Sequence, residues 1–332
     1  MLPDWADYQA TLLAWPGADA AYGRTGRDLL MLYENIIRLL REVHPVRLLV
    51  APDELEHISR LLGGADESLH LEPLLTNDIW MRDAGPISAL DENGTAVFLD
   101  GNFNGWGNKY PHELDRLIPL VLARRWGMTR ISLPLTIEGG AIEVNGSGDL
   151  LTTSGVALNP NRANRDRART EHLLKISFGV KRVHWLERGL NGDDTDGHID
   201  NLARFVTARR IVHVGADVAK DHPDRAVLLD NRARLERLML HDGHPELIAL
   251  PAPQVIREKG RVLPASYANY YRAGTQAGGL VLVPQFGDNG DQEALGILSE
   301  VFPGHRVEGL DARVLLIHGG TFHCITQPLY LN

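Results

Sequence analysis

Cysteine is almost absent from this chain of 332 residues, in which Cys324 is the only one. One cysteine excludes a disulfide within the chain and a zinc site built from several cysteines. No apolar run approaches the roughly 20 residues that a membrane-spanning helix needs. The first ten residues, MLPDWADYQA, contain acidic residues where a signal peptide has basic ones. We therefore expect a cytoplasmic protein.

Positive charge is also scarce. The 34 Lys and Arg residues are outnumbered by 43 Asp and Glu residues, which gives a formal net charge of -9. This balance disfavours nucleic acid and anionic membranes as partners and suits a cationic ligand. The hydrophobic fraction of 44% is ordinary for a globular protein, and the chain has no low-complexity tract.

The same order of predicted elements recurs five times along the chain. Each unit of roughly 60 residues contains a strand, a loop, a helix, a second strand and a closing strand near glycine or polar residues. In the first helix, Leu29, Leu32, Ile36, Leu39 and Leu40 recur at helical spacing. The order predicts an α/β fold, either a closed, radially repeated arrangement or a doubly wound sheet. Since no GxGxxG motif opens a helix, dinucleotide binding is disfavoured.

The predicted closing strands carry side chains that can do chemistry. In chain order these are Asp83, Glu138, His198 with Asp200, Asn269 and Cys324, each position from a different unit. In a closed ring the five strands would point at one axis, so one pocket would gather carboxylates, an imidazole, an amide and a thiol. His198 and Asp200 are two residues apart, so on a strand they share a face.

Further candidates lie close to these positions in sequence. Trp80 offers an aromatic wall against a flat cation. Asp78, two residues earlier, is a second candidate for substrate binding, and Asp194 is placed to reach a positive charge at the far end of a substrate. Each of these candidates also has a purely structural explanation. A lone cysteine such as Cys324 usually fills a core, and so does a tryptophan. Acidic runs are often solvated loops.

Taken together, these groups suit attack on a guanidinium. Asp83 and Asp200 can hold its fork of N–H donors. Its carbon is a poor electrophile, so a thiolate from Cys324 is a better nucleophile than a hydroxyl. His198, oriented by Glu138, can protonate the departing nitrogen and later activate water.

Six stretches resemble the agmatine deiminases and bacterial peptidylarginine deiminases of the guanidine-modifying (pentein) superfamily. They are NDIWMRDAGP, FNGWGNKY, IEGGAIEVNGSGDLLTT, DDTDGHIDN, LPASYANYY and GGTFHCITQP, in family order. The resemblance implies a five-bladed α/β propeller and no metal or organic cofactor. Because it covers nearly the whole chain, it implies one catalytic deiminase domain, residues 1–332.

The resemblance also implies roles for individual residues. Cys324 would become the amidino-cysteine, with His198 as acid and base and Glu138 as the active-site glutamate. Asp83 and Asp200 would hold the guanidinium. Asn269 matches a polar family position, and Asp194 matches a contact to the distal amine of agmatine.

Substrate preference is less clear than the chemistry. Thr321 and Phe322 replace the small aliphatic residue that usually precedes His-Cys in agmatine-type endings, so we expect Phe322 to narrow the pocket. The absence of a secretion signal and an extra C-terminal domain favours a small free substrate over a protein. The leading hypothesis is agmatine deiminase, with N-carbamoylputrescine and ammonia as products.

Several alternatives remain open. One is deimination of free or peptidyl arginine. Free arginine carries an α-carboxylate that a cation must bind, and Arg82, Lys109 and Arg204 are candidates. The same covalent intermediate also permits amidino transfer to an amine. The chain could instead be an inactive protein that binds polyamines or arginine.

A metal-assisted hydrolase is a further alternative. It would use the cluster of Asp194, Asp196, His198 and Asp200. The family also suggests a homodimer. The Gly- and Asn-rich segment 101–111 is a candidate lid.

Overall fold

The computed structural model describes residues 1–17, 22–23, 25–164 and 166–331. Its described strands fall into five small sheets of one common design and one hairpin, rather than one doubly wound sheet. In each small sheet, the first strand runs antiparallel to the second and the second runs parallel to the third. The fold is therefore mixed α/β.

The strands are ordered along the chain. The first sheet contains β18 (Gln327–Leu329), β1 (Ala10–Ala14), β2 (Val46–Val50) and β3 (Leu69–Pro73). The second contains β4 (Ile87–Leu90), β5 (Ala96–Asp100) and β6 (Thr129–Ser132), and the third contains β7 (Ile142–Val144), β8 (Asp149–Thr153) and β9 (Arg182–Leu186). The fourth contains β10 (Ala203–Phe205), β11 (Arg210–Val214) and β12 (Glu246–Leu250), and the fifth contains β15 (Tyr271–Thr275), β16 (Gly278–Gln285) and β17 (His305–Asp311). The hairpin is β13 (Arg257–Glu258) with β14 (Arg261–Val262).

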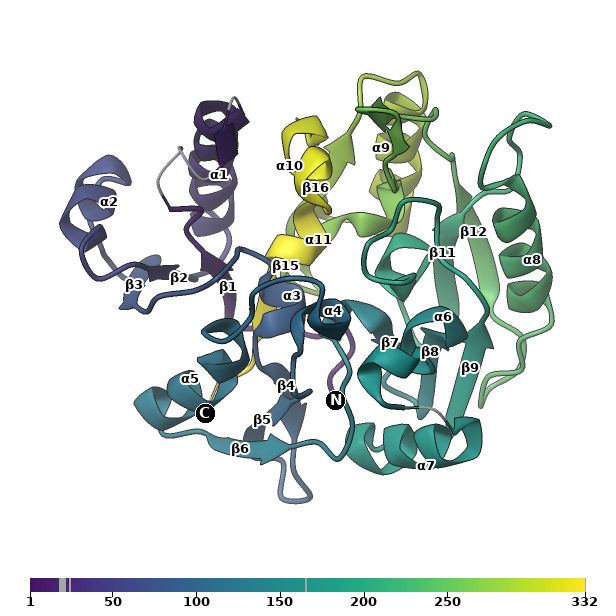
Figure 1. Cartoon of the computed structure of the whole chain (residues 1–332), viewed down its shortest axis with the longest axis horizontal. Helices are drawn as coiled ribbons and strands as arrows, with labels where there is room; N and C mark the ends of the chain where they lie inside the picture. Colours follow the sequence, from purple (N-terminus) through teal and green to yellow (C-terminus); the bar gives the residue numbers. More distant parts are fainter. Residues whose placement is uncertain (18–21, 24, 165, 332) are drawn as a thin grey trace.

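Longer helices lie at the outside of the molecule (Figure 1). They are α1 (Gly26–Arg41), α2 (Leu55–Leu61), α5 (Ile118–Trp126), α7 (Arg167–Phe178), α8 (Arg225–Glu236) and α9 (Gly290–Val301). Helix α10 (Arg313–His318) leads into the C-terminal segment. Local signals explain individual ends: the carboxylate of Asp166 accepts from the Arg169 N–H at the start of α7, and Gly179 ends it with a positive φ of 68°.

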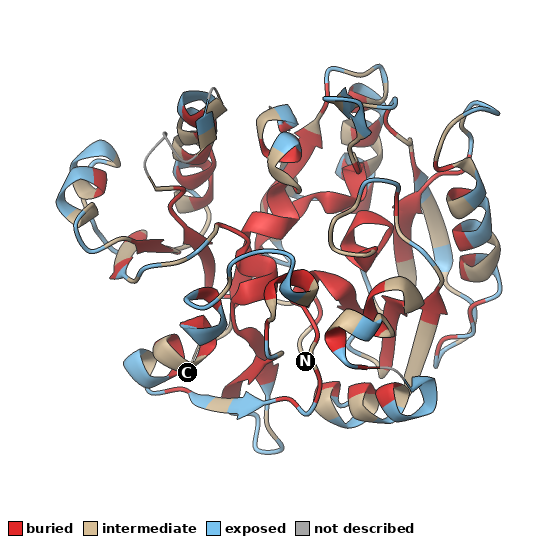
Figure 2. Cartoon of the chain, in the orientation of Figure 1, coloured by how far each residue is buried: buried red, intermediate tan, exposed pale blue. Residues whose placement is uncertain are grey.

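Single-turn helices and 3-10 turns connect the strands and the longer helices. They are α3 (Met81–Ala84), α4 (Gly105–Asn108), α6 (Ser154–Ala157) and α11 (Phe322–Ile325), with the 3-10 turns η2 (Asp115–Leu117), η3 (Gly139–Ala141), η4 (Pro160–Arg162), η5 (Ile199–Asn201) and η6 (Tyr267–Asn269). In Figure 1 the five sheets follow one another around α3, α4 and α11. Figure 2 shows α3 and α11 as buried, whereas the outer helices keep exposed faces.

The predicted unit boundaries are wrong by one strand. We expected the segment 79–90 to close the first unit, but its strand β4 pairs antiparallel with β5 in the second sheet. The reason is chain length, because only five residues separate β4 from β5, and a short connection favours a hairpin. Each predicted closing strand thus pairs with the first strand of the next unit. The last, β18, pairs with β1, with Leu329 opposite Ala10.

The expected helix in the first unit is present. Helix α1 buries Leu29, Ile36, Leu39 and Leu40 as the spacing predicts, while Leu32 is only partly buried. None of the helices in the described parts of the chain is long and apolar enough to cross a membrane.

Candidate active site

Six predicted site residues lie in or directly before short helical turns, with one such turn in each unit. Asp83 belongs to α3, Glu138 directly precedes η3, His198 directly precedes η5 and Asp200 lies within it, Asn269 belongs to η6 and Cys324 to α11. Our placement of these residues on strands is therefore wrong. The turns come just before the strands, and His198 and Asp200 are brought together by a helical turn rather than by alternation along a strand.

Gly140 shows how closely the site residues approach one another. Its N–H donates to Asp83 Oδ1 at 3.0 Å. A Cβ atom at this position would lie 2.6 Å from His198 Nδ1, 2.9 Å from Asp83 Oδ1 and 3.0 Å from Asp200 Oδ2. Only glycine leaves room for these three side chains, which come from two other units, to converge here.

His198 lies between two carboxylates. Its Nδ1 is 3.7 Å from Asp83 Oδ1, and its Nε2 is 3.9 Å from Glu138 Oε2. Burial opposes protonation of His198, but the charges of Asp83 and Glu138 outweigh it and raise its pKa to about 9. Burial also raises the pKa of Asp83 to about 6. The site thus keeps a protonated imidazole at neutral pH.

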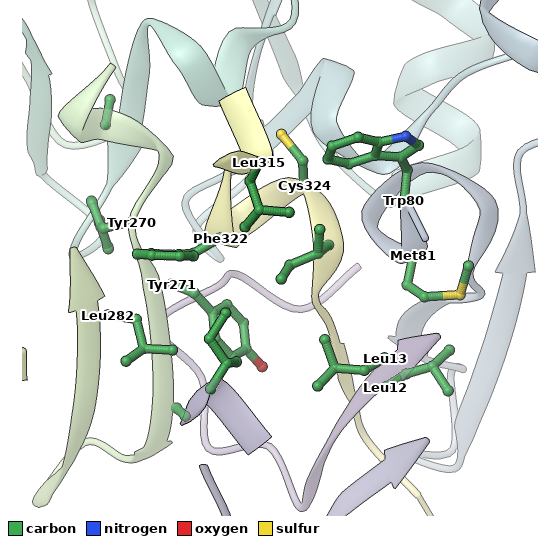
Figure 3. Close-up of a cluster of buried hydrophobic side chains, with 14 of the residues drawn as sticks. Leu12, Leu13, Trp80, Met81, Tyr270, Tyr271, Leu282, Leu315, Phe322 and Cys324 are labelled. Carbon is green, nitrogen blue, oxygen red and sulfur yellow. The ribbon is translucent and has the colours of Figure 1, made fainter. Parts of the chain in front are cut away.

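The thiol of Cys324 lies beside polar groups from two other units. Its Sγ is 3.2 Å from Asn269 Nδ2 and 3.9 Å from Asp200 Oδ2. Gly320 packs against both side chains, since a Cβ there would lie within 3 Å of the sulfur and of the Trp80 ring. Figure 3 shows the ring of Trp80 next to the sulfur. Burial and the charges of Asp200 and Asp83 raise the pKa of the thiol well above its ordinary value.

A small pocket opens above the sulfur. Five predicted residues line it, namely Asp78, Trp80, Asp83, Asp194 and Cys324, together with Trp106, Tyr110 and His318. Four others, Glu138, His198, Asp200 and Asn269, lie buried behind these, with at most 1% of each exposed. A larger surface groove between α1 and α2 contains none of the predicted site residues.

Phe322 does not narrow this pocket, contrary to our expectation. Its ring is fully buried in the hydrophobic core. Figure 3 shows it beside Leu315 and Tyr271, on the side of Cys324 away from Trp80. Side chains two residues apart on a helical turn point in nearly opposite directions, so Phe322 points into the core while Cys324 faces the pocket.

Trp106 was not recognised from the sequence as a site residue. Its indole Nε1 donates to Asp83 Oδ2 at 2.9 Å, and its backbone has a φ of 54°, which is rare for a bulky residue. The only signal was the motif NGWGN, where flanking glycines permit such a turn. The left-handed conformation places the indole over Asp83.

Arg162 was also missed. Its guanidinium is fully buried and binds Glu138 Oε1 through Nε at 2.9 Å, while Nη1 pairs with Asp196. Burial raises the pKa of Glu138, but the nearby imidazole of His198 and the charge of Arg162 more than offset this and lower it. The sequence signal was weak, because an arginine after Asn-Pro-Asn reads as an ordinary surface turn.

The mouth of the pocket is acidic but partly neutralised. Asp194 accepts from the Tyr110 hydroxyl at 3.0 Å and pairs with Arg261 at 2.8 Å. Asp78 accepts from the Ile79 N–H at 2.8 Å, burial raises its pKa, and it has no ion pair within the described residues. Asp78 is therefore the less satisfied of the two carboxylates.

Three buried polar atoms of the site have no hydrogen-bond partner among the described residues. They are Glu138 Oε2, His198 Nε2 and Asp200 Oδ1. Unpaired buried polar atoms are costly, so such a cluster indicates a place for a polar ligand. The acidic run 194–200 does not supply a metal site, since no group of three His, Cys, Asp or Glu side chains in the described ranges has metal-binding geometry.

The fold and the site together define a mixed α/β protein with a cysteine, a histidine and carboxylates gathered from different units at its centre. A family model described as Porphyromonas-type peptidyl-arginine deiminase matches residues 1–329. The chain therefore belongs to this family.

Two relatives illustrate the similarity. The chain is 33% identical over 349 residues to a Streptomyces coelicolor protein named "Putative agmatine deiminase", covering 98% of this chain and 97% of that one. A solved structure of a C. jejuni agmatine deiminase variant with substrate bound is 30% identical, with a TM-score of 0.89, covering 100% of this chain and 96% of the other.

Proposed function

We propose that this protein is an agmatine deiminase, which converts agmatine and water into N-carbamoylputrescine and ammonia. The single observation that carries the proposal is the cluster of unpartnered buried atoms, Glu138 Oε2, His198 Nε2 and Asp200 Oδ1, behind a pocket that ends at Cys324. These atoms have no partner among the described residues, and a guanidinium supplies N–H donors to match the carboxylate atoms. The names of the relatives support the same reading.

The scaffold that we propose is a five-bladed α/β propeller, with residues 1–332 forming one catalytic domain. The pairing of β18 with β1, which joins the two ends of the chain, supports this arrangement. The order of the five sheets around the central turns in Figure 1 supports it as well.

In this proposal, Asp83 and Asp200 bind the guanidinium, and Trp80 packs against its plane. Two carboxylates match its charge and its fork of donors. The distal amine is held by Asp78 and Asp194 at the mouth. Asp78 contributes more, because Asp194 is already paired with Arg261.

The substrate itself helps to ionise the nucleophile. Cys324 is protonated in the free enzyme, since burial and the charges of Asp200 and Asp83 raise its pKa. A bound guanidinium cation offsets these two negative charges, so the thiol loses its proton more readily in the complex. Asn269 donates to the sulfur and stabilises the thiolate.

The reaction has two halves. The thiolate of Cys324 forms a bond to the guanidinium carbon, the bond to one terminal nitrogen breaks, and His198 protonates that nitrogen so that it leaves as ammonia. A thiouronium remains on the sulfur. A water molecule, deprotonated by His198, then adds to the same carbon, and the carbon–sulfur bond breaks to release the ureido product and the thiolate.

Kinetics with agmatine, free arginine and an arginine-containing peptide, measured side by side, test the assignment. We expect agmatine to have the highest kcat/KM. Equal or faster turnover of either arginine substrate would overturn it.

Deimination of arginine is the second candidate, and one observation favours it. Arg261 lies at the mouth beside Asp194 and is exposed, so it can meet a substrate carboxylate. The three cations proposed from the sequence are less accessible. Arg82 and Arg204 are buried beside Asp4, and Lys109 is less exposed than Arg261 and is bound by both Asp196 and the backbone carbonyl of Asp194. If arginine is the substrate, Arg261→Ala should raise the KM for arginine, whereas the KM for agmatine should stay the same or fall.

A further inference from the structure

A chain of hydrogen bonds runs from the guanidinium-facing carboxylate of Asp200 to a residue near the N-terminus. Asp200 Oδ2 is 2.7 Å from His323 Nδ1, and His323 Nε2 is 2.6 Å from Asp4 Oδ2. The side chains of Asp200 and His323 are buried, and that of Asp4 is only 11% exposed. His323 directly precedes Cys324, yet its ring lies behind Asp200 and not in the pocket.

The two short contacts of the His323 ring, one with Asp200 and one with Asp4, each need a shared proton. Burial alone would raise the pKa of Asp4, but the charges of Arg82, His323 and Arg204 outweigh burial and hold it well below its ordinary value. Burial likewise opposes ionisation of Asp200, but the hydrogen bond and charge of His323 lower its pKa. With both carboxylates ionised, each ring nitrogen of His323 must donate, so the imidazole is a cation.

Other charged groups face this chain from three further elements. Arg82 from α3 is 3.2 Å from Asp4 Oδ1, and Arg204 from β10 is 2.5 Å from Asp4 Oδ2. Glu143 from β7 binds the other side of Arg204 at 2.8 Å. Burial and the charges of Arg204 and Arg82 lower the pKa of His323 overall, although the charge of Asp4 and the hydrogen bond with Asp200 oppose them. The case for the cation therefore rests on geometry, because each ring nitrogen lies within 2.7 Å of a carboxylate oxygen. Asp4 is therefore the anion that allows a cationic imidazole to persist among two guanidiniums.

We propose that Asp4 and His323 are positioning residues that hold Asp200 ionised and orient it for the guanidinium. His323 occupies Oδ2 of Asp200 and leaves Oδ1, which is buried and has no partner among the described residues, for the substrate. This inference rests on the proposed function. It adds that the N-terminal segment completes the active site although it never touches the substrate.

Asp4→Asn tests the proposal while preserving the shape of the side chain. Without the anion, His323 loses its second proton and Asp200 is more easily protonated. We expect a second ionisation, that of Asp200, to enter the acid limb of kcat/KM, so that its slope rises from the value of one set by Asp83 alone towards two. The additional loss relative to the wild type acts mostly through KM, grows as the pH falls and disappears towards pH 8.

Asp7→Asn is the matched control. Asp7 lies on the same segment, accepts from the Gln276 N–H at 2.6 Å and is exposed. We expect its pH profile to match the wild type. An unchanged profile for Asp4→Asn, or a loss equal at every pH and accompanied by lower thermal stability, would mean that Asp4 is only structural and would overturn the proposal.

A measurement on the wild-type protein works even if variants fail to fold. Nitrogen-15 labelling of histidine and NMR should show both ring nitrogens of His323 carrying protons at pH 7, with the signals assigned by their loss in His323→Gln. A bare ring nitrogen at that pH contradicts the inference. Because this readout needs no turnover, it separates failure of the inference from failure of the agmatine assignment.

Discussion

At the scale of single residues, the pKa values of Asp83 and His198 define a working pH range. In the proposed mechanism Asp83 must be ionised to bind a cation, and burial raises its pKa to about 6. In the same mechanism His198 must be protonated to release ammonia, and the charges of Asp83 and Glu138 raise its pKa to about 9. We expect kcat/KM for agmatine to fall below about pH 6 and above about pH 9.

The residual activity of Asp83→Asn should lack the acid limb near pH 6. Thermal unfolding measured across the same pH range is the control, because it separates titration of the site from loss of the folded protein. A limb that stays in Asp83→Asn would show that another group titrates there.

Trp106→Phe removes the indole donor from Asp83 while keeping an aromatic ring. We expect KM for agmatine to rise by about tenfold to a hundredfold, since a hydrogen bond to a charged group contributes about 1.5–3 kcal/mol. Trp126→Phe is a matched control, because Trp126 also donates to a carboxylate, Glu72, at 3.1 Å, but lies outside the pocket. Equal effects in both variants would contradict a specific role for Trp106.

The proposed catalytic residues are easier to recognise in the sequence than the residues that support the site. Cys324, His198 and Asp200 belong to motifs with unusual composition. Asp4, Arg162 and Trp106 bind His323, Glu138 and Asp83, and the first of these contacts joins residues 319 positions apart. No local pattern encodes such contacts, because they depend on how the units are packed.

At the scale of elements, the turn at η3 has no space for a side chain at its second glycine. We expect Gly140→Ala to lower kcat/KM at least a hundredfold and stability by about 1–3 kcal/mol, because its Cβ would collide with groups of His198, Asp83 and Asp200.

Gly296→Ala in α9 is the control for this substitution. Its Cβ would meet nothing within 4 Å. We expect unchanged activity and a gain of about 0.5–1 kcal/mol from helix propensity. Full activity in Gly140→Ala would show that the three side chains need not converge.

Most strands could be predicted from the sequence, but the central turns could not. Runs such as TLLAW and GLVLVPQ have the apolar character of buried strands, and they form β1 and β16. Turns such as η5 are short and polar, and they are stabilised by contacts with other units rather than by local propensity. The pairing of β4 was missed for a different reason, because its short connection to β5, which favours a hairpin, was not used to assign the strand.

At the scale of the whole molecule, the pairing of β18 with β1 links residues more than 300 positions apart. Leu329 is fully buried in this pair. We expect Leu329→Ala to lower the free energy of unfolding by about 2–4 kcal/mol. Leu331→Ala, at a partly buried position two residues later, should change it far less.

Thermal unfolding followed by tryptophan fluorescence and by circular dichroism checks this prediction. If the chain is one domain, both signals should shift together in Leu329→Ala. Separate transitions, or an equal effect of both leucine substitutions, would contradict the proposed closure of the ring by its terminal strands.

The central claim is that Cys324 attacks the guanidinium carbon. The most direct test is mass spectrometry of the protein quenched with acid during steady-state turnover of agmatine. We predict that the peptide containing Cys324 carries an added mass equal to agmatine less ammonia, and that Cys324→Ser carries none. An unmodified Cys324 peptide under rapid turnover, or full activity in Cys324→Ser, would contradict the account.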